Sequence, residues 1–324
     1  MSILITGGGG FIGQCLGAAL MVDPAVKSLL LTDVAKPSTP SLPKGQTKSC
    51  TVSTTAADLT KLEDCQALLN TGLTHVYLLH GIMSGAAEAN LELGLAVNVD
   101  SMRNVLDTLR KVQPGIRVIF PSSLAVFGQT PQDFVVDENT MPLPQSSYGA
   151  QKYISETLLN DYSRRGLLDG IVVRLPTIIV RPGKPSGAAS SFCSGIIREP
   201  LNKEKSVLPV STSLKLWVCS TRTVIRNLLI ARDVPHEALA SSSRVVNLPG
   251  ITVTVQEMLD ALVSIGGKQA LDLVENKHDE TIERIVGSWP AKFDVGRAVQ
   301  LGFQTDGPLE RTFQEYLDDF ASQG

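Results

Sequence analysis

The sequence predicts an α/β fold in which a doubly wound parallel sheet is joined to a smaller C-terminal lobe. Two observations indicate this class: short apolar runs alternate with segments of helical periodicity up to Leu175, and the regular alternation stops after that residue. Strands that alternate with helices form parallel sheets, because each helix returns the chain to the same end of the sheet. We expect a sheet domain over residues 1–175. Residues 176–324 should form mainly the second lobe, with some segments returning to the sheet.

The expected elements follow from the spacing of apolar residues. The expected strands are, in chain order, Ser2–Thr6, Ser28–Asp33, His75–His80, Arg117–Pro121 and Gly170–Leu175. Helices are expected where apolar residues recur three and four positions apart, namely Phe11–Met21, Leu62–Leu69, Ala86–Lys111 and Tyr148–Arg165. In a sheet of this kind the ligand lies beyond the carboxyl ends of the strands, so the residues that follow each strand are candidates for a site.

A glycine-rich stretch follows the first strand directly. Gly7, Gly10 and Gly13 lie in the segment Thr6–Gly13, where the chain passes into the first helix. A strand that turns sharply into a closely packed helix, with its turn backbone against a pyrophosphate, needs positions without side chains. The amino end of the helix then presents free N–H groups and its positive dipole end to the phosphates. The pattern predicts a Rossmann-type dinucleotide-binding turn.

An acid at the end of the second strand indicates which dinucleotide binds. Asp33 lies 20 positions after Gly13, where a carboxylate can accept hydrogen bonds from the ribose diol of adenosine. A carboxylate at this place repels the 2′-phosphate of NADP. The sequence therefore favours NAD.

A tyrosine and a lysine at the start of the fourth expected helix indicate catalysis. Tyr148 and Lys152 are four positions apart, so both side chains lie on one face of the helix. A nearby ammonium favours the phenolate form of a tyrosine, which can then remove a proton from an alcohol. Ser123, which follows a strand, can hydrogen-bond the reacting oxygen. We predict a catalytic triad for hydride transfer in which Lys152 lowers the pKa of Tyr148.

Composition excludes several classes of function. The net charge is −3 and the 29 Lys and Arg residues are scattered, so neither nucleic acid nor an anionic membrane surface is an expected partner. No apolar run approaches the length of a membrane span, and the chain begins directly with a strand, so we expect a cytoplasmic protein. The 5 cysteines and 4 histidines form neither a Cys-x-x-Cys pair nor a His-Glu-x-x-His motif, so neither a disulfide framework nor a metal site is expected.

The combined pattern resembles the extended short-chain dehydrogenases/reductases, the NAD-dependent epimerase/dehydratase family. The resemblance rests on the Thr6–Gly13 turn, Ser123, Tyr148 and Lys152, and it spans the whole chain. It implies that NAD is the cofactor, that Tyr148 is the general base, and that two subunits pair through the third and fourth expected helices. It also implies a set of cofactor-binding residues: Gly7, Gly10, Phe11, Ile12, Gly13, Asp33, Asp58, Leu59, His80, Gly81, Asn98, Tyr148, Lys152 and Pro176.

His80 departs from the family pattern, which has small residues beside the nicotinamide ribose. Two interpretations remain open. The histidine contacts the cofactor or the substrate, or it ends a strand and is hydrogen-bonded to the backbone.

Within the family, several stretches resemble enzymes that oxidise the C2 hydroxyl of a four-carbon sugar acid such as D-erythronate. They lie between Arg174 and Leu201 and at Val246–Gly250 and Gly287–Pro290. A small hydroxy acid needs a cation for its carboxylate and hydroxyl partners for its diol. The candidates are Arg181 and Arg222 for the carboxylate, Ser84, Thr177, Ser190 and Ser191 for the hydroxyls, and Ser123 and Tyr148 for the reacting oxygen. Trp217 is expected in the core.

Other functions remain open on the same scaffold. A nucleotide-sugar epimerase or dehydratase, or a reductase of another small carbonyl compound, would also use Tyr148 and NAD. Dehydratases of this kind carry an Asp-Glu pair next to the serine, where this chain has Leu124–Val126. A non-catalytic NAD sensor can lose the tyrosine or the lysine, and this chain has kept both.

Overall fold

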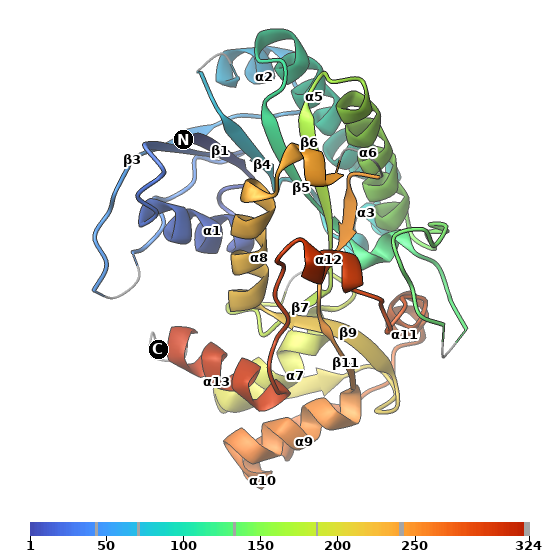
Figure 1. Cartoon of the computed structure of the whole chain (residues 1–324). Coiled ribbons are helices and arrows are strands. Elements are labelled where there is room, and N and C mark those ends of the chain that lie inside the picture. Colours follow the sequence, from blue (N-terminus) through green and yellow to red (C-terminus); the bar gives the residue numbers. More distant parts are fainter. Residues whose placement is uncertain (43–44, 70–71, 132–133, 186, 240–242, 321–324) are drawn as a thin grey trace.

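The computed structural model describes residues 1–320 except 43–44, 70–71, 132–133, 186 and 240–242. Its centre is a seven-stranded parallel sheet in the order β3-β2-β1-β4-β5-β6-β10 (Figure 1). This is the strand order of a Rossmann-type doubly wound sheet, in which the direction of winding reverses between β1 and β4. The strands are β1 (Ser2–Thr6), β2 (Ser28–Asp33), β3 (Thr51–Ala56), β4 (His75–Leu78), β5 (Arg117–Ser123), β6 (Asp169–Leu175) and β10 (Val245–Asn247). The predicted fold class is confirmed.

Helices cover both faces of this sheet because successive residues of its buried strands point to opposite sides. Ile3 and Ile5 of β1 pack with α1 (Phe11–Met21) and α8 (Thr221–Asp233). Leu4, between them, belongs to the core on the other face. The helices of that face are α2 (Leu62–Leu68), α5 (Ser101–Val112) and α6 (Ser147–Arg164).

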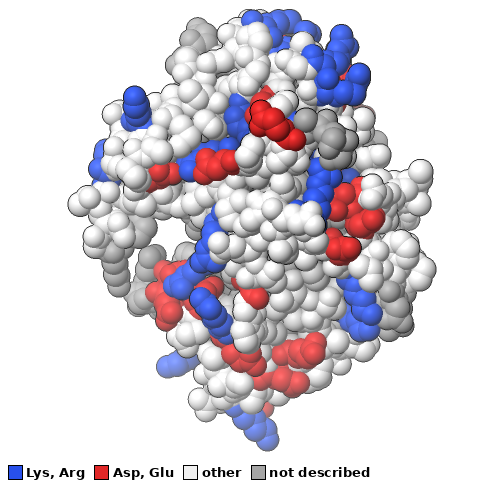
Figure 2. All heavy atoms as spheres, in the orientation of Figure 1, with Lys and Arg blue, Asp and Glu red and all other residues white. Residues whose placement is uncertain are grey.

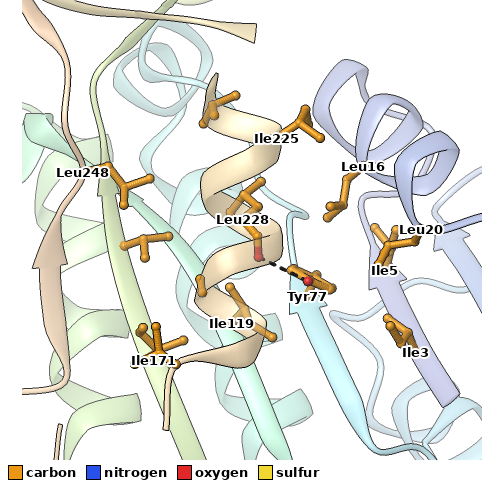
Figure 3. Packing of buried hydrophobic residues seen from close by; sticks show 14 of the residues in the cluster. Ile3, Ile5, Leu16, Leu20, Tyr77, Ile119, Ile171, Ile225, Leu228 and Leu248 are labelled. Atoms are coloured by element: carbon orange, nitrogen blue, oxygen red, sulfur yellow. Dashed lines mark hydrogen bonds between the residues drawn. The ribbon is translucent and has the colours of Figure 1, made fainter. Parts of the chain in front are cut away.

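A buried tyrosine joins α8 to the first core. Tyr77 of β4 is fully buried, and its hydroxyl donates to the carbonyl of Leu228 at 3.2 Å (Figure 3). Because a buried phenol without a partner costs free energy, this bond supports the position of α8 on the sheet.

The second lobe has a core of its own around smaller sheets. One sheet has the order β11-β9-β7 and another pairs β12 with β8. These strands are β7 (Thr177–Ile179), β8 (Ser206–Leu208), β9 (Lys215–Ser220), β11 (Ile251–Thr254) and β12 (Val274–Asn276). The remaining helices of this half are α7 (Ser191–Leu201), α9 (Val255–Gly266), α10 (Lys268–Leu271), α11 (Glu280–Gly287), α12 (Gly296–Gln300) and α13 (Leu309–Phe320).

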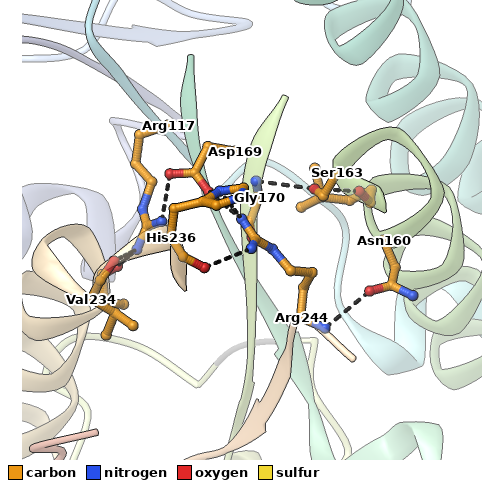
Figure 4. Close-up of polar contacts among 10 residues, drawn as sticks. Arg117, Asn160, Ser163, Asp169, Gly170, Val234, His236 and Arg244 are labelled. Atoms are coloured by element: carbon orange, nitrogen blue, oxygen red, sulfur yellow. Dashed lines mark hydrogen bonds and ion pairs between the residues drawn. The ribbon is translucent and has the colours of Figure 1, made fainter. Parts of the chain in front are cut away.

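An ion-pair network connects the later half of the chain to the amino ends of β5 and β6 (Figure 4). Asp169 accepts hydrogen bonds from Arg117 at 2.8 Å, from His236 at 2.8 Å and from Arg244. Arg117 also donates to the carbonyls of Ala231 and Val234 at the end of α8, at 2.8 and 2.6 Å. The network lies at the end of the strands opposite to the expected ligand side, so its role is to hold α8 and β10 to the sheet.

The structure differs from the predicted elements at two places. The single helix expected over Ala86–Lys111 is divided into α3 (Ser84–Ala89), α4 (Leu91–Leu95), a π-helical turn (Ala96–Asp100) and α5. The break occurs at Asn90, whose backbone is extended and whose side chain accepts the N–H of Leu93, so it caps α4. Strand β3 was not predicted, because its sequence TVSTTA holds few large apolar residues and forms a half-exposed edge.

Charged side chains of both signs are mixed on the face shown in Figure 2. Among the described residues, no helix is both long enough and apolar enough to cross a membrane.

Candidate active site

A cavity of about 670 Å³ opens at the carboxyl ends of the central strands. Its walls come from the turns after β1, β2, β3, β4 and β5, from α6, and from the second lobe. The predicted site residues that line it are Gly7, Gly10, Phe11, Ile12, Gly13, Asp33, Asp58, Leu59, His80, Gly81, Ser84, Ser123, Tyr148, Lys152, Pro176, Thr177, Arg181 and Ser190. The fold thus brings together residues that lie far apart in the chain.

The glycine turn is suited to a close approach by phosphate groups. Gly7 has φ +65°, in the left-handed region that favours glycine. A Cβ on Gly13 would lie 2.5 Å from the carbonyl oxygen of Gly7, so any side chain there would push α1 away from β1. The bare turn and the amino end of α1 therefore fit a pyrophosphate.

Asp33 marks the adenosine end of the cavity. Its carboxylate accepts the N–H of Gly9 at 3.1 Å, which holds it beside the turn. Asp58 and Leu59 line the same cavity after β3. The Asp33 carboxylate can accept hydrogen bonds from a ribose diol, and these residues together fit the adenosine of a dinucleotide without a 2′-phosphate.

His80 has partners at both ring nitrogens. Its Nδ1 lies 2.7 Å from Thr6 Oγ1, and its Nε2 lies 2.9 Å from Ser101 Oγ. Burial, and to a smaller extent the positive charge of Lys152, lower the pKa of His80 to about 3. The ring is neutral at physiological pH. Its partners are two hydroxyl side chains rather than the backbone, and it lines the cavity, so contact with a ligand stays a prediction.

Asn98 does not line the cavity. Its side-chain oxygen accepts the N–H of Ile82 at 2.9 Å, and its amide donates to the Ile82 carbonyl at 3.2 Å and to Gln151 at 2.8 Å. The expectation that Asn98 binds the cofactor is therefore revised: it holds the segment after β4, which includes Gly81.

Tyr148 is buried at the start of α6. The helix is capped by Ser146, whose hydroxyl accepts the N–H of Gly149 at 3.2 Å. A side chain at Gly149 would clash with the carbonyl of Ala125, so glycine allows α6 to lie against the turn that follows Ser123. This close contact brings Tyr148 and Ser123 to the same cavity, where Ser123 favours the phenolate form of the tyrosine. The two predicted catalytic groups therefore lie together.

The pKa of Tyr148 is set by opposing effects. Burial raises it, Ser123 and the positive charge of Arg181 lower it, and the resulting pKa is about 12. That Lys152 also lowers this pKa stays a prediction. The Lys152 ammonium donates to the carbonyl of Pro121 at 3.0 Å and lies 5.7 Å from the centre of the Tyr148 ring.

Lys152 is held in an apolar position with one carboxylate nearby. Only 7% of the residue is exposed. Burial lowers the pKa of Lys152 to about 8, and the negative charge of Glu156 opposes this. Glu156 is itself buried and accepts three hydrogen bonds from Arg174 of β6, the shortest at 2.7 Å.

Arg181 supplies a positive charge to the part of the cavity that the second lobe forms. No carboxylate lies within 4.0 Å of its guanidinium among the described ion pairs, and burial lowers its pKa. Its backbone is held at both polar groups: the N–H donates to Ser194 at 3.0 Å, and the carbonyl accepts from Arg198 at 2.7 Å. An arginine whose backbone is held in this way, and whose guanidinium has no carboxylate partner among the described residues, is suited to bind an anionic ligand.

The expectation that Arg222 binds a substrate carboxylate is corrected. Arg222 lies outside the cavity on α8, and its guanidinium donates two hydrogen bonds to Asp319 of α13, at 2.8 and 2.7 Å. Ser191 begins α7 and does not line the cavity either.

Sequence reasoning did not identify Trp289 as a site residue. Trp289 follows α11 and lines the cavity together with Arg181 and Ser190. Its stretch Gly287–Pro290 was singled out only by resemblance, because nothing local in the sequence shows which wall it reaches. The other tryptophan, Trp217, is confirmed in the core, where its ring stacks on Phe293 at 5.0 Å between centres.

Comparison with known proteins agrees with the geometry. The sequence matches the NAD dependent epimerase/dehydratase family over residues 3–243. It is 41% identical over 320 residues to a D-erythronate dehydrogenase of Haemophilus influenzae, covering 98% of this chain and 99% of that one. It is also 41% identical over an alignment of 329 residues to a D-erythronate dehydrogenase of Cupriavidus necator, covering 98% of both.

A solved structure gives the same result for the fold. The crystal structure of the nucleoside-diphosphate-sugar epimerase from Agrobacterium tumefaciens superposes with a TM-score of 0.90 at 35% sequence identity. The match covers 100% of this chain and 95% of that chain.

Proposed function

Because the chain belongs to the NAD-dependent epimerase/dehydratase family, we propose that it is an NAD-dependent dehydrogenase that oxidises the C2 hydroxyl of a small sugar acid such as D-erythronate. The observation that carries the proposal is the guanidinium of Arg181. It is close enough to Tyr148 to lower the tyrosine pKa, and it has no carboxylate partner among the described residues. A small acid that places its carboxylate on Arg181 can present the adjacent hydroxyl to Tyr148.

The reaction converts a secondary alcohol into a ketone. Tyr148 removes the hydroxyl proton while the hydride leaves the same carbon. NAD, when bound, supplies the carbon that accepts this hydride. Ser123 hydrogen-bonds the reacting oxygen and orients it, and Lys152 is placed to hold the ribose next to the nicotinamide. Ser84, Thr177 and Ser190 are proposed as partners for the remaining hydroxyls.

The cofactor assignment extends to specific residues. We propose that the glycine turn, with Phe11 and Ile12, holds the pyrophosphate, and that Asp33, Asp58 and Leu59 hold the adenosine. Gly81 and Pro176 then lie at the nicotinamide end. On this assignment residues 1–175, with the returning elements α8 and β10, form the cofactor-binding part, and most of residues 176–324 form the substrate-binding part.

We further propose that the protein is a cytoplasmic homodimer active in carbohydrate metabolism. Support for the location comes from its five cysteines, all of which are free thiols. Support for the dimer comes from exposed apolar side chains on adjacent helices, namely Leu91 and Leu93 of α4 and Tyr153 and Ile154 of α6.

The test is the absorbance of reduced nicotinamide with NAD or NADP and a panel of four-carbon sugar acids that includes D-erythronate and L-threonate. We expect growth of the signal with NAD and at least one acid. Tyr148→Phe should reduce kcat by at least roughly a hundred-fold and leave the Kd of NAD within about two-fold. Tyr153→Phe, an exposed tyrosine of the same helix, is the matched control and should keep full activity. Substantial turnover by Tyr148→Phe would contradict the proposed base.

An epimerase would give a different result in the same experiment. Because an epimerase regenerates its cofactor in each cycle, it can retain NAD through purification, whereas a dehydrogenase must release it. No signal with any acid, together with NAD bound to the purified protein, would therefore replace the proposed reaction by an epimerisation.

A further inference from the structure

Two hydrogen bonds join the start of α3 to the segment that precedes α7. The N–H of Gly85 donates to the carbonyl of Gly187 at 3.0 Å, and the N–H of Ala189 donates to Ser84 Oγ at 3.1 Å. We call these four residues the seam. Ser84 is only 5% exposed and Gly187 is exposed, so the seam runs from the interior of the molecule to its surface.

The seam forms one wall of the cavity. Ser84 lines the cavity from one side of the seam, and Ala188 and Ser190 line it from the other. Arg181 and Trp289 complete this end, which lies away from the glycine turn. The residues of the second lobe that can contact a substrate therefore lie next to the seam.

The two glycines of the seam have different surroundings. A Cβ on Gly85 would clash with the carbonyl of Gly187, so the two backbones meet only because residue 85 has no side chain. A Cβ on Gly187 would meet nothing within 4 Å. Alanine at position 85 should therefore separate the two backbones, whereas alanine at position 187 should leave the seam intact.

We propose that the seam is a specificity determinant that closes the substrate end of the cavity around a small acid and excludes any substrate as long as a nucleotide sugar. The cavity of about 670 Å³ must hold the dinucleotide as well as the substrate. This volume is typical of a site for one large ligand. A nucleotide sugar would have to share this volume with the dinucleotide. The inference rests on the proposed function, because it concerns the substrate end of the same site.

The first measurement tests the seam without using activity. Amide hydrogen exchange at Gly85 and Ala189 should be slow in the wild type and in Gly187→Ala, because both N–H groups are bonded. In Gly85→Ala both amides should exchange at least roughly ten-fold faster. Equal protection in the two variants would overturn the claim that the close contact holds the wall shut.

The second measurement tests specificity. The ratio of kcat/KM for a four-carbon acid to kcat/KM for its six-carbon homologue should fall roughly ten-fold in Gly85→Ala, and it should stay within about two-fold of the wild type in Gly187→Ala. If the amides of Gly85→Ala exchange faster but its ratio of kcat/KM values is unchanged, the proposal is overturned. If Gly85→Ala does not fold, Ala189→Pro removes the N–H that donates to Ser84, at a residue that does not line the cavity, and should move the ratio in the same direction.

A third arm separates this inference from the proposed function. If the wild type oxidises no sugar acid, the proposed function fails, and calorimetric titration of UDP-glucose into the NAD-loaded protein decides on the seam. Binding by Gly85→Ala but not by the wild type or Gly187→Ala would support the seam as a size filter. Binding by the wild type, or by none of the three, would overturn it.

Discussion

Arg181 and Tyr148 affect each other's pKa, and both are proposed to contact the substrate. The positive charge of Arg181 lowers the pKa of Tyr148, burial raises it, and the resulting pKa is about 12. The base is therefore neutral in the free protein at pH 7, and its activation depends on the charges and hydrogen bonds around it. This makes the position of one guanidinium important for both affinity and rate.

Replacing Arg181 by lysine should raise the KM for the sugar acid roughly ten- to a hundred-fold, because a lysine cannot reproduce a two-pronged hydrogen bond to a carboxylate. Steady-state kinetics with saturating NAD measures the effect. Arg222→Lys is the matched control: its guanidinium lies outside the cavity, so the KM should stay within about two-fold. Equal KM values for the two variants would remove Arg181 from the substrate site.

Lys152 should make folding stability depend on pH. Its pKa is lowered from 10.5 to about 8 in the folded protein, so unfolding takes up a proton between these values. The charged lysine therefore destabilises the fold most below pH 8, and this penalty fades as the pH rises toward 10.5.

Lys152→Met should consequently gain stability over the wild type at neutral pH. The gain in the free energy of unfolding should be about 2 kcal/mol larger at pH 7 than at pH 9.5, as measured by urea titration. Lys111→Met on α5, where the side chain is exposed, should show the same difference from the wild type at both pH values. A gain for Lys152→Met that does not change with pH would show that burial does not disfavour its charge.

The proximity of the site residues in the first half of the chain could be predicted from the sequence. Which residues of the second lobe reach the site could not. The glycine turn, Asp33, Ser123, Tyr148 and Lys152 follow strands or share one helix face, so their proximity can be derived from short spacings. Arg181 and Arg222 look alike in the sequence. Only the packing of α13 on α8 shows that Arg222 is committed to Asp319.

Among the elements, α6 is joined to the central sheet by a buried ion pair. It carries Tyr148 and Lys152, and one turn later Glu156 connects it to β6 through Arg174. Both side chains of this pair are buried. Removing one charge of a buried pair leaves the other without compensation.

Glu156→Gln should therefore lower the free energy of unfolding by about 3 kcal/mol, because Arg174 keeps its buried charge. Asp161→Asn on the same helix removes a partly exposed pair with Arg164 and should cost less than about 1 kcal/mol. Urea unfolding at pH 7 compares the two variants. Similar losses would mean that the buried pair does not fix α6.

Element prediction failed where a side chain competes with helical periodicity. The apolar spacing over residues 86–111 is helical, but Asn90 caps α4 and interrupts the backbone. The resulting start of α3 at Ser84 supplies one half of the seam. A periodicity argument cannot locate such a break, since both sides of it are helical.

At the scale of the whole molecule, the exposed apolar side chains of α4 and α6 determine the expected assembly. Ile154 of α6 is 46% exposed. Ile154→Glu should convert the proposed dimer into a monomer at micromolar concentration, because burial of a charge at the interface is costly. Sedimentation velocity measures the change. Val299→Glu on α12, at a residue that is 55% exposed, is the control and should leave the assembly unchanged. A wild type that is monomeric at all concentrations would contradict the dimer.

The sheet and its strand direction could be predicted because strands and helices alternate in the first half of the chain. The irregular second half could not be assigned in detail, since its segments alternate between two cores. Leu228 of α8 packs in the core of the central sheet, whereas Leu216 of β9 packs in the core of the second lobe. Only the folded structure shows which segment serves which core.

The place of β10 in the central sheet has a consequence for biosynthesis. Strand β6 leaves the ribosome about 70 residues before β10, its neighbour in the sheet. At roughly 5–20 residues per second, the apolar edge of β6 remains without its neighbour for several seconds. An unpaired edge of this kind is a template for aggregation. The nascent chain therefore exposes this edge of β6 until β10 has been synthesised.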